Sequence, residues 1–182
     1  MDFKIIGVIV VLALIGAYFV FFPGTSDIDS INQVFSKNGF NVYPFEEQTP
    51  FVNADLSVLR SLATDLEAVK VSSPEGKDFL ELSKNYVAFF VLQKEILVLN
   101  DRLFSNSDFC NNKTDWNKIN SNFSDIFILV QKVNSNVTKF KENYPEVSKD
   151  VGFTGTNSFK FDGGLAANRK TLNDAYEVAC NA

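Results

Sequence analysis

The stretch Trp116–Pro145, WNKINSNFSDIFILVQKVNSNVTKFKENYP, holds the clearest structural pattern of this chain. Its apolar residues recur at alternating spacings of three and four, and they are Trp116, Ile119, Phe123, Ile126, Val130, Val133, Val137, Phe140 and Tyr144. Such a seam runs along one side of an α-helix for about four heptads. The sequence therefore predicts a long helix that packs along a nearly parallel neighbouring helix and ends at Pro145.

Two kinds of neighbour would cover this seam. A helix of the same chain would make an intramolecular bundle, whereas the same helix of a second copy would make a homodimeric coiled coil. Phe127 and Leu129 lie beside the seam and widen the apolar face beyond what a two-stranded coil needs. We therefore favour the bundle over the homodimer.

A second long helix is predicted from Pro74 to about Phe104. It is apolar on nearly every side, and a helix of this kind is usually central in its domain, with other helices around it. A membrane span is the alternative interpretation. However, Lys94 and Glu95 would then lie near the middle of the span, at a cost of several kcal/mol. We therefore place this helix in the bundle.

Shorter segments complete the helical pattern. One runs over Ser26–Asn38, and another begins at Asn53 or Asp55 and ends near Ser72. A last helix is predicted over Leu165–Cys180, with inward residues Leu165, Leu172, Ala175, Tyr176 and Ala179.

Two segments have strand patterns instead. Gly39–Phe45 alternates apolar and polar residues, and Pro44 would keep it at the edge of a sheet. Val151–Phe161 is rich in glycine and threonine, with two phenylalanines alternating around Lys160. We expect these segments to pair as a small two-stranded element that leans on the helices, because two strands alone are marginal. Residues 46–52 are predicted to be a loop.

Ile5–Phe22, IIGVIVVLALIGAYFVFF, is an unbroken apolar run of eighteen residues between Lys4 and Pro23. A helix of this length reaches roughly 27 Å, close to the ~30 Å hydrocarbon core of a bilayer, and Lys4 can snorkel to the surface. A cleaved signal peptide is the alternative, but its apolar stretch is shorter and ends at a small-residue cleavage site, which this stretch does not have. We predict an uncleaved signal anchor, with the lipid bilayer as the partner of residues 5–22.

Charge around the span predicts its orientation. Lys4 and the α-amino group precede it, whereas acidic residues follow it until Lys37. This weak bias leaves residues 1–4 as a cytoplasmic stub of a single-pass cell-membrane protein and places the rest outside. Residues 23–52 then connect the anchor to a disulfide-linked domain over 53–182. The predicted fold class is mainly α: one transmembrane helix, then an extracytoplasmic bundle of about four helices with a small β element.

Composition excludes several classes of function. The chain has 182 residues, a formal net charge of -5 and no histidine. An acidic domain is a poor partner for nucleic acid or anionic lipid head groups. Without histidine, the usual general base and the commonest transition-metal ligand are missing. Two cysteines are too few for a structural zinc site made of four cysteines, and without histidine the mixed type is excluded too. No cofactor or metal is predicted.

Cys110 and Cys180 are predicted to form a disulfide, because the outer compartment is oxidising and both residues lie at helix ends. Closing a loop of roughly 70 residues would stabilise the fold by about 4 kcal/mol on the chain-entropy model. Two free buried thiols are the alternative interpretation.

Three N-x-S/T triplets make Asn112, Asn122 and Asn136 candidate glycosylation acceptors. Chance alone gives about 2.4 such triplets in a chain of this composition, so their number adds little to the prediction of an exported domain.

One candidate anion site begins the last helix. Asp162, Gly163 and Gly164 precede Arg169 and Lys170, so backbone N–H groups at the helix start would face a phosphate or a carboxylate. A simple helix-starting turn with Asp162 as its cap explains the same residues, and we favour it.

Acidic residues supply two further candidate sets. Glu46 and Glu47 would form an acid pair, or join Asp162 in a calcium site, because hard cations need only oxygen ligands. Asp174 and Glu177 lie three residues apart on the last helix. Solvated surfaces explain both sets better. No catalytic, cofactor-binding or metal-binding residue is therefore predicted.

The leading hypothesis for function is a non-enzymatic interaction or structural role with a protein partner, as an accessory subunit of a cell-envelope complex. A small-ligand-binding or sensor domain is the alternative, because helical bundles hold ligands between their helices. A carboxylate-dependent glycan hydrolase is a second alternative and needs two acids about 5 to 9 Å apart. An exposed apolar patch favours the first hypothesis, an enclosed cavity the second and a deep acidic pocket the third.

Overall fold

The computed structural model describes residues 26–40, 45, 48–153 and 162–180. The predicted membrane span over 5–22 and the stub over 1–4 lie outside the described residues. None of the helices in the described ranges combines the length and apolar character that a bilayer crossing requires.

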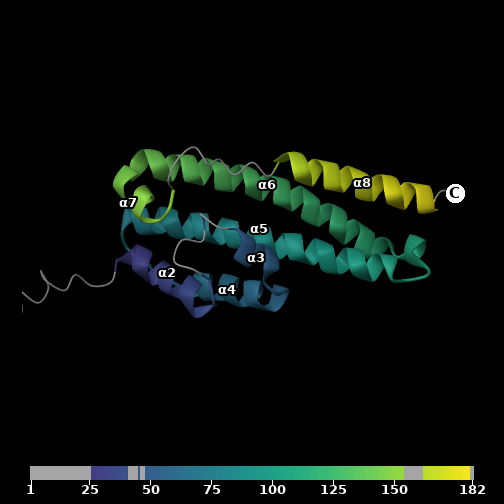
Figure 1. Cartoon of the computed structure of the whole chain (residues 1–182), viewed down its shortest axis with the longest axis horizontal. Coiled ribbons are helices and arrows are strands. Elements are labelled where there is room, and N and C mark those ends of the chain that lie inside the picture. Colours follow the sequence, from purple (N-terminus) through teal and green to yellow (C-terminus); the bar gives the residue numbers. More distant parts are fainter. Residues whose placement is uncertain (1–25, 41–44, 46–47, 154–161, 181–182) are drawn as a thin grey trace, which may run out of the picture.

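The described residues form seven α-helices and one 3₁₀ turn, with no strand among them. The two long helices, α5 and α6, lie side by side and antiparallel along the length of the molecule (Figure 1). Helices α2 and α4 cover α5 at one end, and α8 runs beside α6 at the other. The elements in chain order are α2 (Asp27–Lys37), α3 (Thr49–Asn53), α4 (Leu56–Ala68), α5 (Pro74–Phe104), η1 (Phe109–Asn111), α6 (Lys113–Asn143), α7 (Pro145–Asp150) and α8 (Asp162–Cys180).

The heptad seam of α6 is buried against α5 within the chain, which confirms the predicted intramolecular bundle. Its end members, Trp116 and Tyr144, are half-buried, while the seven residues between them are buried. Helix α5 has the predicted bounds and is central, in contact with α2, α4 and α6. Its start is capped by Ser73, whose hydroxyl accepts from the backbone N–H of Gly76 at 3.1 Å.

Helix α3 corrects the prediction that residues 46–52 are a loop, since residues 49–53 are helical. Pro50 lies in its first turn, where a proline is favoured. The short helix places Phe51 in the centre of an aromatic cluster, with its ring 4.3 Å from that of Phe40 and 5.1 Å from that of Tyr86. Burial raises the pKa of the Tyr86 hydroxyl well above its usual range.

Most of the predicted β element lies outside the described residues, which omit 41–44 and 154–161. The parts that are described do not form strands. Phe40 and Phe45 bury their rings in the core, and Gly39 adopts a φ of 85° in the turn that ends α2. Val151 and Gly152 form the turn that follows α7, a helix that the sequence pattern did not predict.

Helix α8 covers less of the bundle than its sequence pattern predicts. Leu165 is buried and both Leu172 and Tyr176 are half-buried, but Ala175 and Ala179 are exposed. The two alanines were predicted to face inward, and this is wrong: among the described residues, the main neighbours of α8 are α6 and η1, and both alanine side chains are exposed. A helix with two neighbours on one side buries a narrow stripe.

Candidate functional site

An open groove lies between α5 and α8, with α6 beneath it; we call it the α5–α8 groove. Its volume is about 460 Å³. The floor is formed by Phe123 and Ile126 of α6, two buried members of the heptad seam. The walls are formed by residues of α5 and α8, and they give the groove its chemical character.

The α5 wall presents one helical face, made of Gln93, Ile96, Leu97, Asn100 and Phe104. The spacings of three, four and seven place these residues in one stripe. Leu97 is 52% exposed and Phe104 is 39% exposed, which is unusual for large apolar residues of a central helix.

Helix α4 is too short to cover the whole length of α5. The ion pair between Lys84 Nζ and Glu67 Oε2, at 2.7 Å, lies in the covered part of α5. The pair between Arg60 Nη2 and Glu95 Oε1, at 2.8 Å, joins the N-terminal half of α4 to α5. Helix α4 begins only four residues before Arg60, so the last turns of α5, from Leu97 onward, extend past it.

The α8 wall carries Leu165, Asn168, Thr171, Leu172 and Ala175, again on one helical face. None of the side chains that line the groove is titratable, and its polar groups are three amides and one hydroxyl. The groove is therefore an apolar surface with neutral hydrogen-bonding groups, and it has no acid or base for catalysis.

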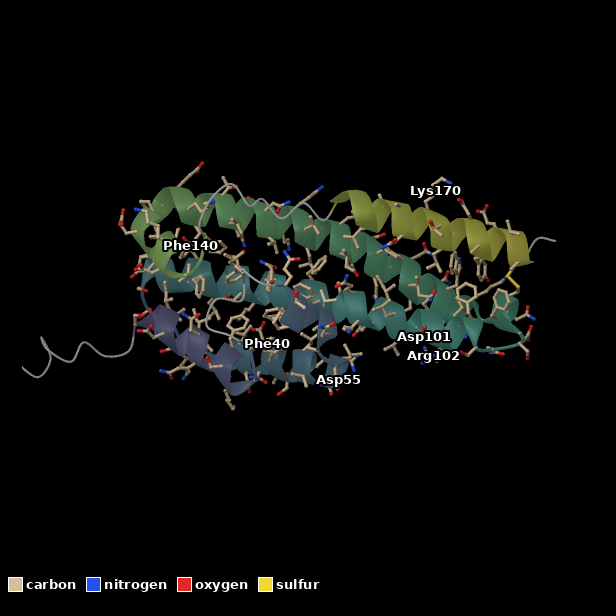
Figure 2. All side chains as sticks on the ribbon, in the orientation of Figure 1. Phe40, Asp55, Asp101, Arg102, Phe140 and Lys170 are labelled. Atoms are coloured by element: carbon tan, nitrogen blue, oxygen red, sulfur yellow. A yellow bond between two sulfur atoms is a disulfide. The ribbon has the colours of Figure 1, made fainter. Side chains whose placement is uncertain are left out.

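A disulfide and a stack of aromatic rings join α8 to the bundle at one end of the groove. Cys110 and Cys180 form the predicted disulfide. The rings of Trp116 and Tyr176 stack with centroids 3.9 Å apart and planes 7° apart. The Tyr176 hydroxyl also donates to the backbone carbonyl oxygen of Cys110 at 3.0 Å. Figure 2 shows the disulfide at the end of the molecule where α8 finishes.

An ion pair joins the end of α5 to the start of α6, close to the disulfide. Arg102 donates to both carboxylate oxygens of Asp115, with Nε 2.7 Å from Oδ2. The bond from Arg102 lowers the pKa of the Asp115 carboxyl, and a bond from the Asn112 amide at 2.9 Å lowers it further. The pair aligns the two long helices where the chain reverses.

A second depression, of about 330 Å³, lies where α2, α7 and the start of α5 meet. Its lining includes four acids, Asp27, Asp29, Glu75 and Asp150. Asp27 accepts backbone N–H bonds from Ser73 at 2.7 Å and Ser72 at 2.8 Å, and these bonds lower the pKa of its carboxyl. Asp29 closes the capping box of α2. These two acids hold helix starts in place.

The candidate glycosylation acceptors take structural positions. Asn122 is fully buried and donates its amide to Glu95 Oε2 at 3.2 Å. Asn112 caps α6, with its side-chain oxygen accepting from the backbone N–H of Asp115. Asn136 lies in the last third of α6, and its amide donates to Glu81 Oε1 at 3.5 Å. In the folded chain the Asn122 amide is therefore inaccessible to a glycosylating enzyme.

The other candidate residues do not come together as a site. Glu46 and Glu47 lie outside the described residues, and so does the side chain of Asp162, where α8 begins. Lys170 pairs with Asp174 at 2.6 Å along the surface of α8. Across the described ranges, no group of acids or cysteines has the geometry to hold a metal ion.

Sequence reasoning missed the groove. Its one signal was the apolar character of α5 over residues 96–99, which the sequence assigned to burial. Compared with family models, curated proteins and solved structures, the chain matches none of them. The geometry of the chain alone therefore carries the functional argument.

Proposed function

We propose that this chain is a non-enzymatic interaction domain that binds an amphipathic helix of a partner protein in the α5–α8 groove. The observation that carries the proposal is an open apolar groove whose α5 wall leaves Leu97 and Phe104 exposed. Contiguous apolar surface of this kind is typical of protein interaction sites. The role that fits it is an accessory subunit of a membrane complex.

The shape of the groove favours a helix as its occupant. From Gln93 to Phe104 the α5 wall is roughly 16 Å long, which is about three helical turns. Both walls present side chains at helical spacings, so ridges of a third helix would fit between them. Helices α5, α6 and α8 then form three sides of a four-helix arrangement that the partner completes.

The chemistry of the lining restricts the partner's face. Burying a charge in a groove with no charged lining residue is unfavourable, because nothing there compensates its lost hydration. The contacting face of the partner helix is therefore apolar, with small neutral polar side chains opposite Asn100 and Asn168.

The predicted anchor belongs to the same proposal. Residues 5–22 would tether the domain to the membrane, with the groove outside the cell, and the eighteen-residue apolar run supports this. Protease added to intact cells should remove the C-terminal domain. A domain that survives protease in intact cells and is cut in lysed cells would contradict this topology.

Site-specific photo-crosslinking in intact membranes tests the groove. A photoreactive residue in place of Leu97 should give a discrete protein adduct. Ile128 of α6 is the matched control, because it is 53% exposed and does not line the groove. Equal adducts from both positions, or none from position 97, would overturn the proposal.

A charge placed in the groove makes the crosslinking test specific. Thr171→Lys adds a cation to the α8 wall and should abolish the adduct at position 97. Ala166→Lys adds the same charge to an exposed position of α8 outside the groove and should leave the adduct unchanged. An adduct that both variants leave intact would place the contact elsewhere.

A small neutral ligand is the second candidate occupant. The groove volume of about 460 Å³ is within the range of ligand sites, and the lining offers amides for orientation. The crosslinking experiment separates the candidates, because a small ligand would add a small mass to the chain instead of a second protein.

We do not propose the glycan hydrolase. Two of the four clustered acids hold helix starts, and no acid lines the α5–α8 groove.

A further inference from the structure

We propose that the Cys110–Cys180 disulfide holds α8 on the bundle as a strap, so that an external dithiol dismantles the groove by releasing its α8 wall. The inference concerns the regulation of the α5–α8 groove and rests on the function proposed for it.

The contacts of α8 with the bundle are few. Leu165 is its only buried side chain among the described residues, with Leu172 and Tyr176 half-buried against α6 and η1. The ion pair between Lys170 and Asp174 lies within α8 itself and does not attach the helix to the bundle. An element with so little buried apolar surface opens more easily than the core helices.

The remaining attachments gather at one end of α8. The disulfide, the Trp116–Tyr176 stack and the bond from Tyr176 to the Cys110 carbonyl all lie within its last five residues. Breaking the disulfide leaves that end held mainly by the ring contacts of Tyr176 with Trp116 and Phe109 and by the hydrogen bond of its hydroxyl to Cys110. Both cysteines are half-buried, so a reductant reaches them more readily than it would reach a disulfide in the core.

The chemistry is thiol–disulfide exchange. A thiolate of the dithiol attacks one sulfur, the S–S bond breaks, and the other cysteine leaves as a thiolate. The second thiol of the reductant then attacks the mixed disulfide and releases the first cysteine. Two electrons pass from the dithiol to the protein. The dithiol becomes a disulfide, and Cys110 and Cys180 become thiols.

Release of α8 would dismantle the groove. Leu165, Leu172 and Ala175 leave with the helix, and half-buried Trp116 loses the ring stacked on it. The wall on α5 and the floor on α6 stay in place, because the heptad seam holds those two helices together. The redox state of one bond thus controls whether the groove has two walls.

Trp116 reports the state of the strap, since the chain has a single tryptophan. We would treat the full chain, in detergent micelles, with dithiothreitol and record tryptophan emission together with hydrogen exchange. The expected result is a red shift of the emission and a loss of amide protection over α8, with protection over α5 and α6 unchanged. Cys180→Ser should show the same state without reductant, and reductant should then cause no further change.

Two results would overturn the strap. In the first, reduction changes neither the tryptophan emission nor the amide protection over α8, which would show that packing alone holds the helix. The other is loss of protection over the whole chain, which would make the disulfide a general staple.

Crosslinking from position 97 separates this inference from the proposed function. If the specific adduct persists and α8 stays docked after reduction, the strap is refuted and the proposed binding in the groove stands. If reduction releases α8 but leaves the adduct unchanged, the disulfide does hold α8, but the partner does not need the α8 wall for binding. Release of α8 together with loss of the adduct supports both.

Discussion

Gly76 lies in the first turn of α5 against Asp27 of α2, and its missing side chain makes that approach feasible. A Cβ atom at this position would lie 2.5 Å from Cβ of Asp27 and 2.8 Å from the Ser73 hydroxyl. Both neighbours are fixed, because Asp27 accepts the N–H bonds that start α5 and Ser73 caps it.

Gly76→Ala should therefore lower the free energy of unfolding by about 1–3 kcal/mol, although alanine is the better helix former. Gly164→Ala is the matched control, since a Cβ there meets no atom within 4 Å. In the control variant the free energy of unfolding should rise by up to about 1 kcal/mol. Denaturant unfolding of both variants measures the difference, and a Gly76→Ala chain as stable as the parent would refute the close contact.

Asp115 makes stability depend on pH. Its pKa is lowered in the folded chain by the bond from Arg102, so the unfolded chain binds its proton more readily. The stabilisation is present above the ordinary carboxyl pKa of about 3.9 and is lost as the pH falls through the lowered value.

Asp115→Asn should remove this part of the acid sensitivity, so stability should fall less steeply below about pH 4 than in the parent chain. Asp125→Asn, on an exposed part of α6, is the control and should keep the parent slope. Unfolding curves at a series of pH values provide the test. Equal slopes for Asp115→Asn and the parent would contradict the assignment.

At the scale of the element, α5 has two different kinds of face near its end. Leu103 is fully buried, whereas Leu97, six residues earlier, is half exposed in the groove. One leucine therefore packs in the core, whereas the other, in our proposal, contacts a partner.

Leu103→Ala should lower the free energy of unfolding by about 2–5 kcal/mol, because it leaves a cavity in the core. Leu97→Ala should change it by less than about 0.5 kcal/mol while weakening the adduct formed from a photoreactive residue at Phe104. Unfolding and crosslinking measured on the same variants check both expectations. A large loss of stability for Leu97→Ala would make Leu97 a core residue.

The sequence pattern predicts some of the helices correctly and misses others. The bounds of α5 and the seam of α6 follow from apolar spacing and from Pro74 and Pro145, which are local signals. Helix α3 has only five residues, too few for a period to appear, and packing of Phe51 decides it. Ala175 and Ala179 fit the inward pattern of α8, yet both side chains are exposed.

At the scale of the whole molecule, the two ends of the long helices differ. At one end α2, α3 and α4 close an aromatic core around Phe51, which contacts rings of Phe35, Phe40, Tyr86 and Phe90. At the other end, within the described ranges, α8 covers the long helices on one side (Figure 1). The groove exists because the covering is incomplete there.

Phe51→Ala should therefore cost about 3–5 kcal/mol of unfolding free energy, since it empties the centre of that core. Val52→Ala changes the next residue of the same helix, which is 43% exposed, and should cost less than about 0.5 kcal/mol. Thermal or denaturant unfolding distinguishes the two. Equal effects would mean that α3 is not part of the core.

The two long helices, the seam that joins them and the pairing of the cysteines could be predicted from the amino-acid sequence, because apolar period, proline positions and cysteine number are properties of the chain. The helical state of α3, the narrow buried stripe of α8 and the open end of α5 became visible only in the folded chain. Those features depend on how the helices pack against one another. Such contacts join residues far apart in the chain, and no local pattern encodes them.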